Sequence, residues 1–495
     1  MARTSAKSLR YPRPDDWFAP PAIPPAVASA TFAALGVLAG AGIVLAVRYG
    51  PMWLAAAALA TLLPAALLIG TRRFLLAAIL IDIPFQIDVH LAYREELAQL
   101  GTLGGYNVSV TTFALAGLYL LWIYEALGSP GVIPRPRFKE TWAPALILAG
   151  CALSLLNAAQ PQLALMEIWL LFQLYLLFLY IVSRVDSRAE IRFVLLVLFG
   201  GLLLQSLLIL QSGFTRSTFD LGVISTAVDP SYQTGLIWRA GGTLGSPISA
   251  AGYLGLLIAP ALALAVTSRG KRWRQLGWAA ATAGALAMLV TLSRGGWLTL
   301  GLSLLLFIAV GRRRALLPTW LPTAGLVLGV LCLPLFALAM DTRLSTGDAG
   351  SSSVRPVHYQ LAGEIIARQP LLGVGANNFA AVLPEHAGPR YSQEWLYTIH
   401  NKFLLIWAES GVLALIGFVA LLVTGIAAGF RAAANRGRLL GSLGLAFGLA
   451  ILAQVPHMAV DMFHARPETQ LLWTVVALNI VLARRPPTDA ETAQQ

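Results

Sequence analysis

Residues 391–411, Tyr-Ser-Gln-Glu-Trp-Leu-Tyr-Thr-Ile-His-Asn-Lys-Phe-Leu-Leu-Ile-Trp-Ala-Glu-Ser-Gly, cross from a polar segment into an apolar one. They end a polar stretch that begins at Asp341 and lies between two apolar runs. His400 falls at the border, where an imidazole can change its charge near neutral pH while the membrane holds it in place. We therefore expect long helices to build a platform and the polar stretch to carry chemistry on its outer face.

The composition of the whole chain assigns the class of protein. Hydrophobic residues make up 57% of the 495 residues and charged residues only 12%, with a mean hydropathy of +0.71. This leaves far too little polar surface for a soluble protein. Cys151 and Cys332 both lie in apolar runs, so we interpret them as small core residues and expect neither a disulfide nor a metal site there.

Apolar runs long enough to cross roughly 30 Å of hydrocarbon recur along the chain. Because several are shorter than the usual span of about twenty residues, we expect about 12–14 transmembrane helices in an all-α polytopic membrane protein. The runs lie at 26–47, 52–70, 73–87, 108–126, 142–157, 164–183, 192–213, 247–267, 276–292, 297–310, 318–340, 401–429, 438–460 and 468–483.

Basic residues mark alternate connections between these runs. Cytoplasmic loops carry the excess of lysine and arginine, so the pattern predicts that both termini lie inside. Residues 1–25 are basic and proline-rich without an apolar core, which indicates a cytoplasmic tail and not a signal peptide. We expect one transmembrane domain at 26–483 and a second tail at 484–495. Topology accounts for the net charge of +12, and we expect no nucleic-acid partner. The basic connections are 72–73, 135–139, 184–192, 269–274, 312–314, 431–438 and 484–485.

Three outer segments are long, at 88–107, 213–246 and 341–400. The first is a candidate for an amphipathic interfacial helix. The third is the large outer loop, which we expect to carry short helices. Its Gly373-Val-Gly375 sequence has no preceding strand, which a nucleotide-binding loop requires, so we interpret it as a tight turn that shapes the loop.

Four residues converge at the outer boundary in this topology: Arg239, Arg294, Arg355 and His400. An arginine between apolar spans is costly unless it is paired or functional. A single such arginine is explained by contact with lipid headgroups, but three together with a histidine run against the positive-inside trend. Guanidinium groups bind phosphate oxygens through paired hydrogen bonds. The group therefore predicts a site for a lipid diphosphate.

His400 is the candidate general base, because a neutral imidazole can accept a proton from an attacking hydroxyl. Asn401, Tyr397 and Trp395 are candidate supporting residues. An interfacial aromatic belt is the default interpretation of the two aromatic residues, and a sugar-stacking platform is the alternative. Glu409 faces away from His400 on the following helix, so we expect it to serve helix packing.

Three further residues, His457, Asp461 and His464, lie at the outer end of the next-to-last run and are candidates to line the same cavity. His386 is a secondary candidate without supporting neighbours. The sequence has no Asp-x-Asp pair and no His/Cys cluster at metal spacing, so we expect no catalytic metal and no cofactor.

The order and spacing of these motifs resemble those of the O-antigen ligase and O-antigen polymerase superfamily, over roughly residues 200–480. This resemblance implies a GT-C-type glycosyltransferase of the bacterial inner membrane that acts at the periplasmic face. Its donor would be an undecaprenyl-diphosphate-linked glycan. The motifs are Arg239–Pro247, Ser293–Gly296, Arg355, Pro370–Gly375 with Phe379, His400-Asn401 and Glu409-x-Gly411.

The family implies a role for individual residues. The counterpart of His400 is its proposed catalytic base, and those of Arg239 and Arg294 bind the diphosphate. In this chain the turn has the sequence Ser246-Pro247-Ile248-Ser249, whereas many family members carry an asparagine after the proline. This difference leaves the role of the turn open. Attack by the acceptor from the face opposite the diphosphate would invert the sugar carbon.

The acceptor separates the alternatives. A ligase transfers glycan to lipid A core, a polymerase to another lipid-linked glycan, and a third relative to protein. We favour the ligase. A transporter or flippase of lipid-linked sugars is the more distant alternative, because its cations should line a cavity at the middle of the membrane.

Overall fold

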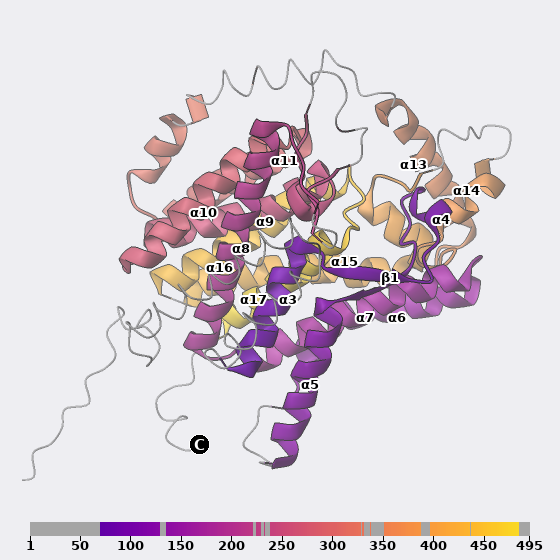
Figure 1. The fold of residues 1–495 in the computed structure, drawn as a ribbon, viewed down its shortest axis with the longest axis horizontal. Helices are drawn as coiled ribbons and strands as arrows, with labels where there is room; N and C mark the ends of the chain where they lie inside the picture. The colour runs from indigo at the N-terminus through magenta and orange to yellow at the C-terminus, as the bar shows by residue number, and fades with distance from the viewer. Residues whose placement is uncertain are drawn as a thin grey trace, which may run out of the picture.

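The computed structural model describes residues 70–128, 135–220, 224–228, 232, 238–327, 329–330, 337, 351–387, 397–435 and 437–484. The expected run 26–47, the run 52–70 except its last residue, ten residues of the run 318–340, the N-terminal tail, Cys332 and Trp395 lie outside these residues, as does the C-terminal tail beyond residue 484. Figure 1 shows long helices packed along one another, with smaller elements grouped at one side.

The long helices confirm an all-α polytopic membrane protein. Within the described residues, seven helices are long and apolar enough to cross a membrane, namely α5, α7, α8, α9, α11, α15 and α16. The long helices are α3 (Thr71–Phe85), α5 (Val110–Gly128), α6 (Trp142–Ser154), α7 (Pro161–Arg184), α8 (Arg188–Thr215), α9 (Pro247–Thr267), α10 (Lys271–Val290), α11 (Arg294–Arg313), α15 (Lys402–Asn435), α16 (Arg438–Met458) and α17 (Arg466–Ala483).

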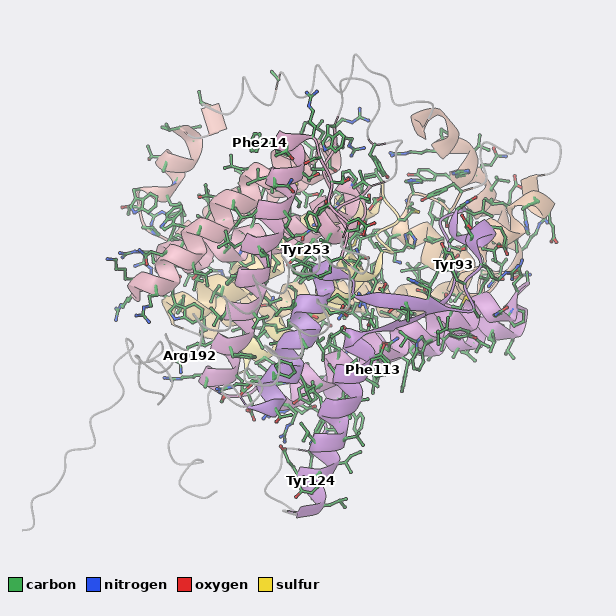
Figure 2. The ribbon with its side chains drawn as sticks, in the orientation of Figure 1. Tyr93, Phe113, Tyr124, Arg192, Phe214 and Tyr253 are labelled. Carbon is green, nitrogen blue, oxygen red and sulfur yellow. The ribbon has the colours of Figure 1, made fainter. Side chains whose placement is uncertain are left out.

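Many large side chains on the outside of this bundle are apolar, as a lipid environment requires. Figure 2 shows Phe113 and Tyr124 projecting from α5, where they are 71% and 76% exposed. Tyr253 of α9 is 1% exposed, inside the bundle. Because apolar residues cover both the surface and the interior, exposure on this surface indicates contact with lipid and not a polar face.

Small residues bring the helix backbones together. A Cβ atom on Gly150 of α6 would lie 2.6 Å from the backbone nitrogen of Ala414, and one on Gly417 of α15 would lie 2.7 Å from that of Ile147. Close approach through glycine and alanine is the usual way in which membrane helices associate, because lipid removes most of the hydrophobic driving force between them. The packing of α6 on α15 places the helix that follows His400 against the N-terminal half of the chain.

The helices share two common ends. At one end, Thr243 Oγ1 donates to the Pro84 carbonyl at 2.7 Å and joins η5 (Gly242–Leu244) to the end of α3. We call this the His400 end, since α15 begins there. At the other, the basic end, Arg484 after α17 donates to the Val182 carbonyl near the end of α7 at 2.5 Å. Basic residues at helix ends on this side include Arg72, Arg184, Arg313, Arg438 and Arg484.

The segment 88–107 is a hairpin, and the expectation of an amphipathic helix there was wrong. Strands β1 (Asp88–Leu91) and β2 (Tyr106–Ser109) pair antiparallel, with Asp88 opposite Ser109. Helix α4 (Glu95–Ala98) between them is a single turn. Short alternating stretches that contain valine suit strands, and Gly101, with φ +80°, ends the helical turn.

A buried ion pair fixes the hairpin to the core. Arg466 at the start of α17 is 6% exposed, and its Nη1 lies 2.8 Å from Oδ2 of Asp82, which is 1% exposed. Arg466 Nε lies 3.1 Å from Oδ2 of Asp88 on β1. Thr111 of α5 also donates its hydroxyl to Asp82, at 2.7 Å. Segments far apart in the sequence therefore meet at one guanidinium at the His400 end.

Candidate functional site

His400 is held immediately before α15. Asn401 caps this helix, because its Oδ1 accepts hydrogen bonds from the backbone N–H groups of Phe403 and Leu404, each at 3.0 Å. The Tyr359 hydroxyl donates to the His400 carbonyl at 3.3 Å. Backbone contacts on both sides thus fix where the imidazole sits. The position of Asn401 indicates a capping role for this residue.

The His400 side chain lies in a charged and aromatic setting. The ring of Tyr397 stacks on it with centroids 5.5 Å apart and planes inclined by 28°. Burial lowers the pKa of His400 below its ordinary 6.5, and the nearby Arg355 and His358 lower it further. Asp461 and a hydrogen bond with the Thr398 backbone act in the opposite direction on this pKa without reversing the shift. The imidazole is therefore neutral at pH 7 and able to accept a proton.

The connection between α16 and α17 covers the start of α15. The Lys402 backbone N–H donates to the Asp461 carbonyl at 3.1 Å, and Asp461 is 6% exposed. Its carboxylate lies within electrostatic range of three histidines, His400, His457 and His464. Burial lowers the pKa of His464 to about 4, with Lys402 acting in the same direction. The residues expected at the outer end of the next-to-last run are therefore grouped around one carboxylate.

Arg355 reaches this group from the outer loop. It lies on α13 (Ser351–Arg368), one helical turn from His358, which is 3% exposed. Helix α13 packs with α14 (Phe379–Ala387) and the first turns of α15 around a small apolar core. That core is separate from the main bundle core and places α13 over His400. Its buried members are Leu361, Ala362, Ile365, Ile366, Val374, Phe379, Val382, Leu383, Ile399, Leu405 and Ala408.

The glycine turn docks on a break in α15. Gly411 has φ 74° and ψ −178°, which interrupts the helix and leaves carbonyls and an N–H group without helical partners. Segment 370–375 satisfies them: Val374 and Gly375 donate to the carbonyls of Ala408 and Glu409, each at 2.9 Å. The Val412 N–H donates to the Pro370 carbonyl at 3.1 Å. Gly373 and Gly375, with φ of 70° and 104°, form a tight turn in this segment.

Glu409 completes the docked turn. Its Oε1 accepts a hydrogen bond from the Phe379 backbone N–H at 2.9 Å, at the start of α14. Asn378 Oδ1 accepts one from the Gln160 N–H at 2.7 Å, next to α7. The Glu409-x-Gly411 motif is thus structural, since it fastens the outer loop to the helix that begins at His400.

Replacing Gly411 with alanine tests this role. We expect Gly411→Ala to destabilise the protein by about 1–3 kcal/mol or more, because almost only glycine adopts the backbone conformation of residue 411. A Cβ atom there would also lie 1.9 Å from the Leu371 carbonyl oxygen. The melting temperature in detergent measures the effect. Gly301→Ala is the matched control, because a Cβ atom on this glycine of α11 meets nothing within 4 Å. Equal melting of the two variants would contradict the docking model.

Arg239 and the turn that carries Arg294 form a second part of the site. Arg239 is 6% exposed, its Nε donates to the Thr291 carbonyl at 3.2 Å, and its guanidinium lies 5.0 Å from the ring centroid of Tyr232. Ser293 caps α11, with its hydroxyl accepting from the Gly296 N–H at 3.3 Å. Arg294 is the first residue of that helix. The hydrogen bond to Thr291 therefore brings Arg239 to the turn of Arg294.

His457 links the two parts. A Cβ atom on Gly295 would lie 2.7 Å from Cδ2 of His457, so the turn of Arg294 packs directly on this imidazole. His457 Nδ1 lies 3.0 Å from Gln454 Oε1, and its ring is within electrostatic range of Asp461. Asp461 in turn acts on His400. Contacts therefore connect Arg239 to His457, and the electrostatic influence of Asp461 extends from His457 to His400.

The candidate site residues from the sequence lie in different parts of the structure. His400, Arg355 and Tyr397 lie together, while Arg239 and Arg294 lie at the second part. His386 is elsewhere, on α14, where its Nδ1 lies 3.0 Å from the Val382 carbonyl of its own helix. Within the described ranges, no three His, Cys, Asp or Glu side chains are arranged to hold a metal ion.

Sequence reasoning missed His358 and Tyr359. His358 adds to the electrostatic environment of His400, and Tyr359 holds its backbone. The spacing of His358 three residues after Arg355 was the available signal, because residues at this spacing share a helix face. This spacing was not used in the sequence analysis, because only short helices were expected in the outer loop, whereas α13 is 18 residues long.

Fold and site together define a polytopic membrane protein that presents a neutral histidine and several cations at one membrane boundary. Residues 279–419 match the family model for O-antigen ligase. This match supports the O-antigen ligase superfamily, to which the motifs of the chain also show a resemblance. The match includes Arg294, Arg355, His400 and Gly411 and ends within α15, so Arg239 and Asp461 lie beyond it. No curated protein matches the chain.

Proposed function

We propose that this protein is a membrane glycosyltransferase that moves a glycan from undecaprenyl diphosphate to an acceptor hydroxyl. The acceptor we favour is lipid A core, which makes the reaction that of an O-antigen ligase. The observation that carries the proposal is the position of His400 immediately before a membrane helix, with Tyr397 stacked on its ring and Arg355 within electrostatic range. The O-antigen ligase match over residues 279–419 supports a glycosyltransferase-like enzyme.

The chemistry follows from these groups. The bond between the anomeric carbon and the diphosphate oxygen breaks, and a bond from the acceptor oxygen to that carbon forms on the opposite face. The acceptor proton passes to an imidazole nitrogen of His400. The departing diphosphate gains negative charge, which Arg239 and Arg294, with Arg355, stabilise by paired hydrogen bonds. The residues present thus supply a base and charge stabilisation, and the product is inverted at the sugar carbon.

The proposed orientation places the His400 end at the periplasmic face of the bacterial inner membrane, with both termini in the cytoplasm. It is supported by the basic residues gathered at the opposite ends of the helices, since lysine and arginine are concentrated on the cytoplasmic side. In this orientation, the lipid-linked donor reaches the site from the outer leaflet. A GT-C-type glycosyltransferase would be arranged in the same way.

The pH dependence of the reaction tests the electrostatic environment of His400. Since its pKa lies below 6.5, we expect kcat to fall only when the pH drops below that value and the imidazole becomes protonated. Asp461→Asn removes a charge that favours the imidazolium, so the acid limb should move to lower pH. Arg355→Gln removes a charge that disfavours it, so the limb should move to higher pH. Shifts of the same sign in both variants would contradict the arrangement.

A transfer assay tests the proposed function itself. Purified protein receives undecaprenyl-diphosphate-linked glycan and lipid A core, and the products are separated by mass. Transfer to core by the wild type supports the ligase. A longer donor glycan without transfer to core identifies a polymerase instead. If neither acceptor receives glycan, the enzyme proposal fails, and lipid flipping becomes the activity to measure.

A further inference from the structure

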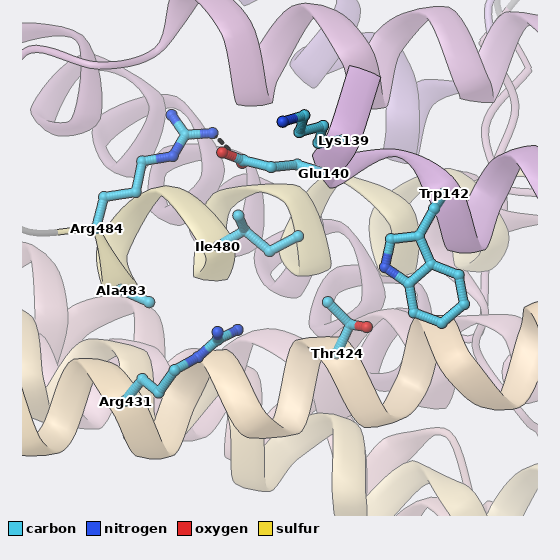
Figure 3. Close-up of a pocket in the computed structure, with 8 residues that line it drawn as sticks. All are labelled: Lys139, Glu140, Trp142, Thr424, Arg431, Ile480, Ala483 and Arg484. Atoms are coloured by element: carbon cyan, nitrogen blue, oxygen red, sulfur yellow. Dashed lines mark hydrogen bonds and ion pairs between the residues drawn. The ribbon is translucent and has the colours of Figure 1, made fainter. Parts of the chain in front are cut away.

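A cavity of about 320 Å³ lies at the basic end of the bundle (Figure 3). It is bordered by the end of α17, the last turns of α15 and the start of α6. Both α15 and α17 begin at the His400 end, and the 18 residues of α17 rise roughly 27 Å, so this cavity is remote from the His400 site. Its lining residues are Lys139, Glu140, Trp142, Thr424, Arg431, Ile480, Ala483 and Arg484.

The cavity carries an excess of positive charge. Lys139, Arg431 and Arg484 come from three different elements around it, while Glu140 is the one acidic residue in its lining (Figure 3). Arg484 pairs with Glu140 through Nη2. Among the described residues, neither Lys139 nor Arg431 forms a hydrogen bond or an ion pair. The charge of this lining is therefore only partly compensated within the protein.

Two hydrogen-bond donors of the Arg484 guanidinium are not used within the described part of the protein. Its Nε and Nη1 atoms are buried and have no hydrogen-bond partner among the described residues. Buried donors of a charged group are costly when unpaired. A guanidinium with free donors, next to a second arginine and a lysine, suits the oxygens of a phosphate group. The cavity has the size of a small-ligand site, for which volumes of about 300–1,000 Å³ are usual.

The surroundings favour a phosphate that belongs to a lipid. Trp142 at the cavity is 50% exposed, as is typical of aromatic residues at the membrane interface. An apolar stripe on α15 leads to the same place: Ile416, Val419 and Val423 are 52%, 41% and 58% exposed, and Thr424 lines the cavity. These residues lie three and four positions apart, on one helix face. An acyl chain can follow this stripe, whereas a soluble phosphate would make no use of it.

We propose that this cavity binds the phosphodiester headgroup of an anionic phospholipid, with an acyl chain along the exposed stripe of α15. Basic pockets between membrane helices are known to take such headgroups. Within the part of the chain that the structure describes, no hydrogen bond links Arg431 to α6 or α17, and the bound lipid would join the three helices at this end. This inference is independent of the proposed transferase activity.

Native mass spectrometry of the full-length protein tests the proposal, with phosphatidylglycerol as the probe and phosphatidylethanolamine as the neutral comparison. The variant is Lys139→Gln with Arg431→Gln, which leaves the Arg484–Glu140 pair in place. We expect its affinity for phosphatidylglycerol to fall by about tenfold or more. The matched control is Lys271→Gln with Arg272→Gln, which makes the same charge change at an exposed site on the same end.

Each outcome of the lipid-binding experiment either supports or overturns the phospholipid site. Preference of the wild type for phosphatidylglycerol, lost in the cavity variant and kept in the control, supports the site. Equal binding of the two lipids by the wild type overturns it, and so does an equal loss in variant and control, which would indicate a general surface charge. Displacement of the lipid by millimolar inorganic phosphate would assign the cavity to soluble phosphate and overturn the lipid. Melting temperatures of both variants, measured without lipid, verify that each is folded.

Discussion

We expect His400→Ala to slow glycan transfer by about 10²–10⁴-fold while donor binding is retained. The size is that of general-base catalysis, which the variant loses. Binding survives because the arginines that would hold the diphosphate belong to other elements: Arg239 contacts Thr291, and Arg294 begins α11. Transfer of labelled glycan to lipid A core measures the rate, and equilibrium binding of the labelled donor measures the affinity.

His386→Ala is the matched control for this experiment. It removes the same side chain from the same outer loop, at a place where the imidazole nitrogen Nδ1 lies 3.0 Å from the Val382 carbonyl of its own helix. Transfer by this variant should equal that of the wild type. If His400→Ala retains full transfer, or if it loses donor binding in proportion to the rate, then His400 is not the base.

Arg466→Met should destabilise the protein by about 3–5 kcal/mol, because it leaves the buried carboxylate of Asp82 without its cation. Asp82 is 1% exposed, and Asp88 would lose its ion pair as well. Equilibrium unfolding in mixed micelles measures the free energy. We also expect transfer to fall, since Arg466 begins the helix that follows Asp461 and thereby positions the connection over His400.

A double-mutant cycle identifies the cause of this loss. Asp82→Leu combined with Arg466→Met should recover part of the stability, because an apolar replacement of a buried ion pair is often tolerated. Additive losses in the double variant would contradict the importance of the pair. Arg272→Met serves as the control at an exposed position of α10, where a change within about 0.5 kcal/mol is expected.

The membrane helices were predictable because their length and composition are set by the lipid. The expected runs 164–183, 192–213 and 247–267 correspond to α7 (Pro161–Arg184), α8 (Arg188–Thr215) and α9 (Pro247–Thr267). An apolar stretch of this length has few other stable conformations, since every backbone group must be paired within the segment. Outside the hydrocarbon this constraint is lifted, and there the prediction for 88–107 was wrong.

The candidate site was predictable only as a set of residue types on one side of the membrane. Sequence placed Arg239, Arg294, Arg355 and His400 there because arginines at outer helix boundaries are costly without a function. It did not show that Arg239 contacts the turn of Arg294 while Arg355 lies with His400. Which residues share a part of the site depends on helix packing, and packing is not encoded in a local pattern.

By itself the sequence determined the class of the protein, its apolar spans, the charge difference between their ends and the glycine turn before His400. These follow from local properties: length, hydropathy and backbone freedom. Only the tertiary structure decided that a break at Gly411 exposes backbone groups for that turn, and that His457 and Asp461 connect the two parts of the site. Those contacts join segments separated by tens to hundreds of residues, so they arise from the packing of the whole chain.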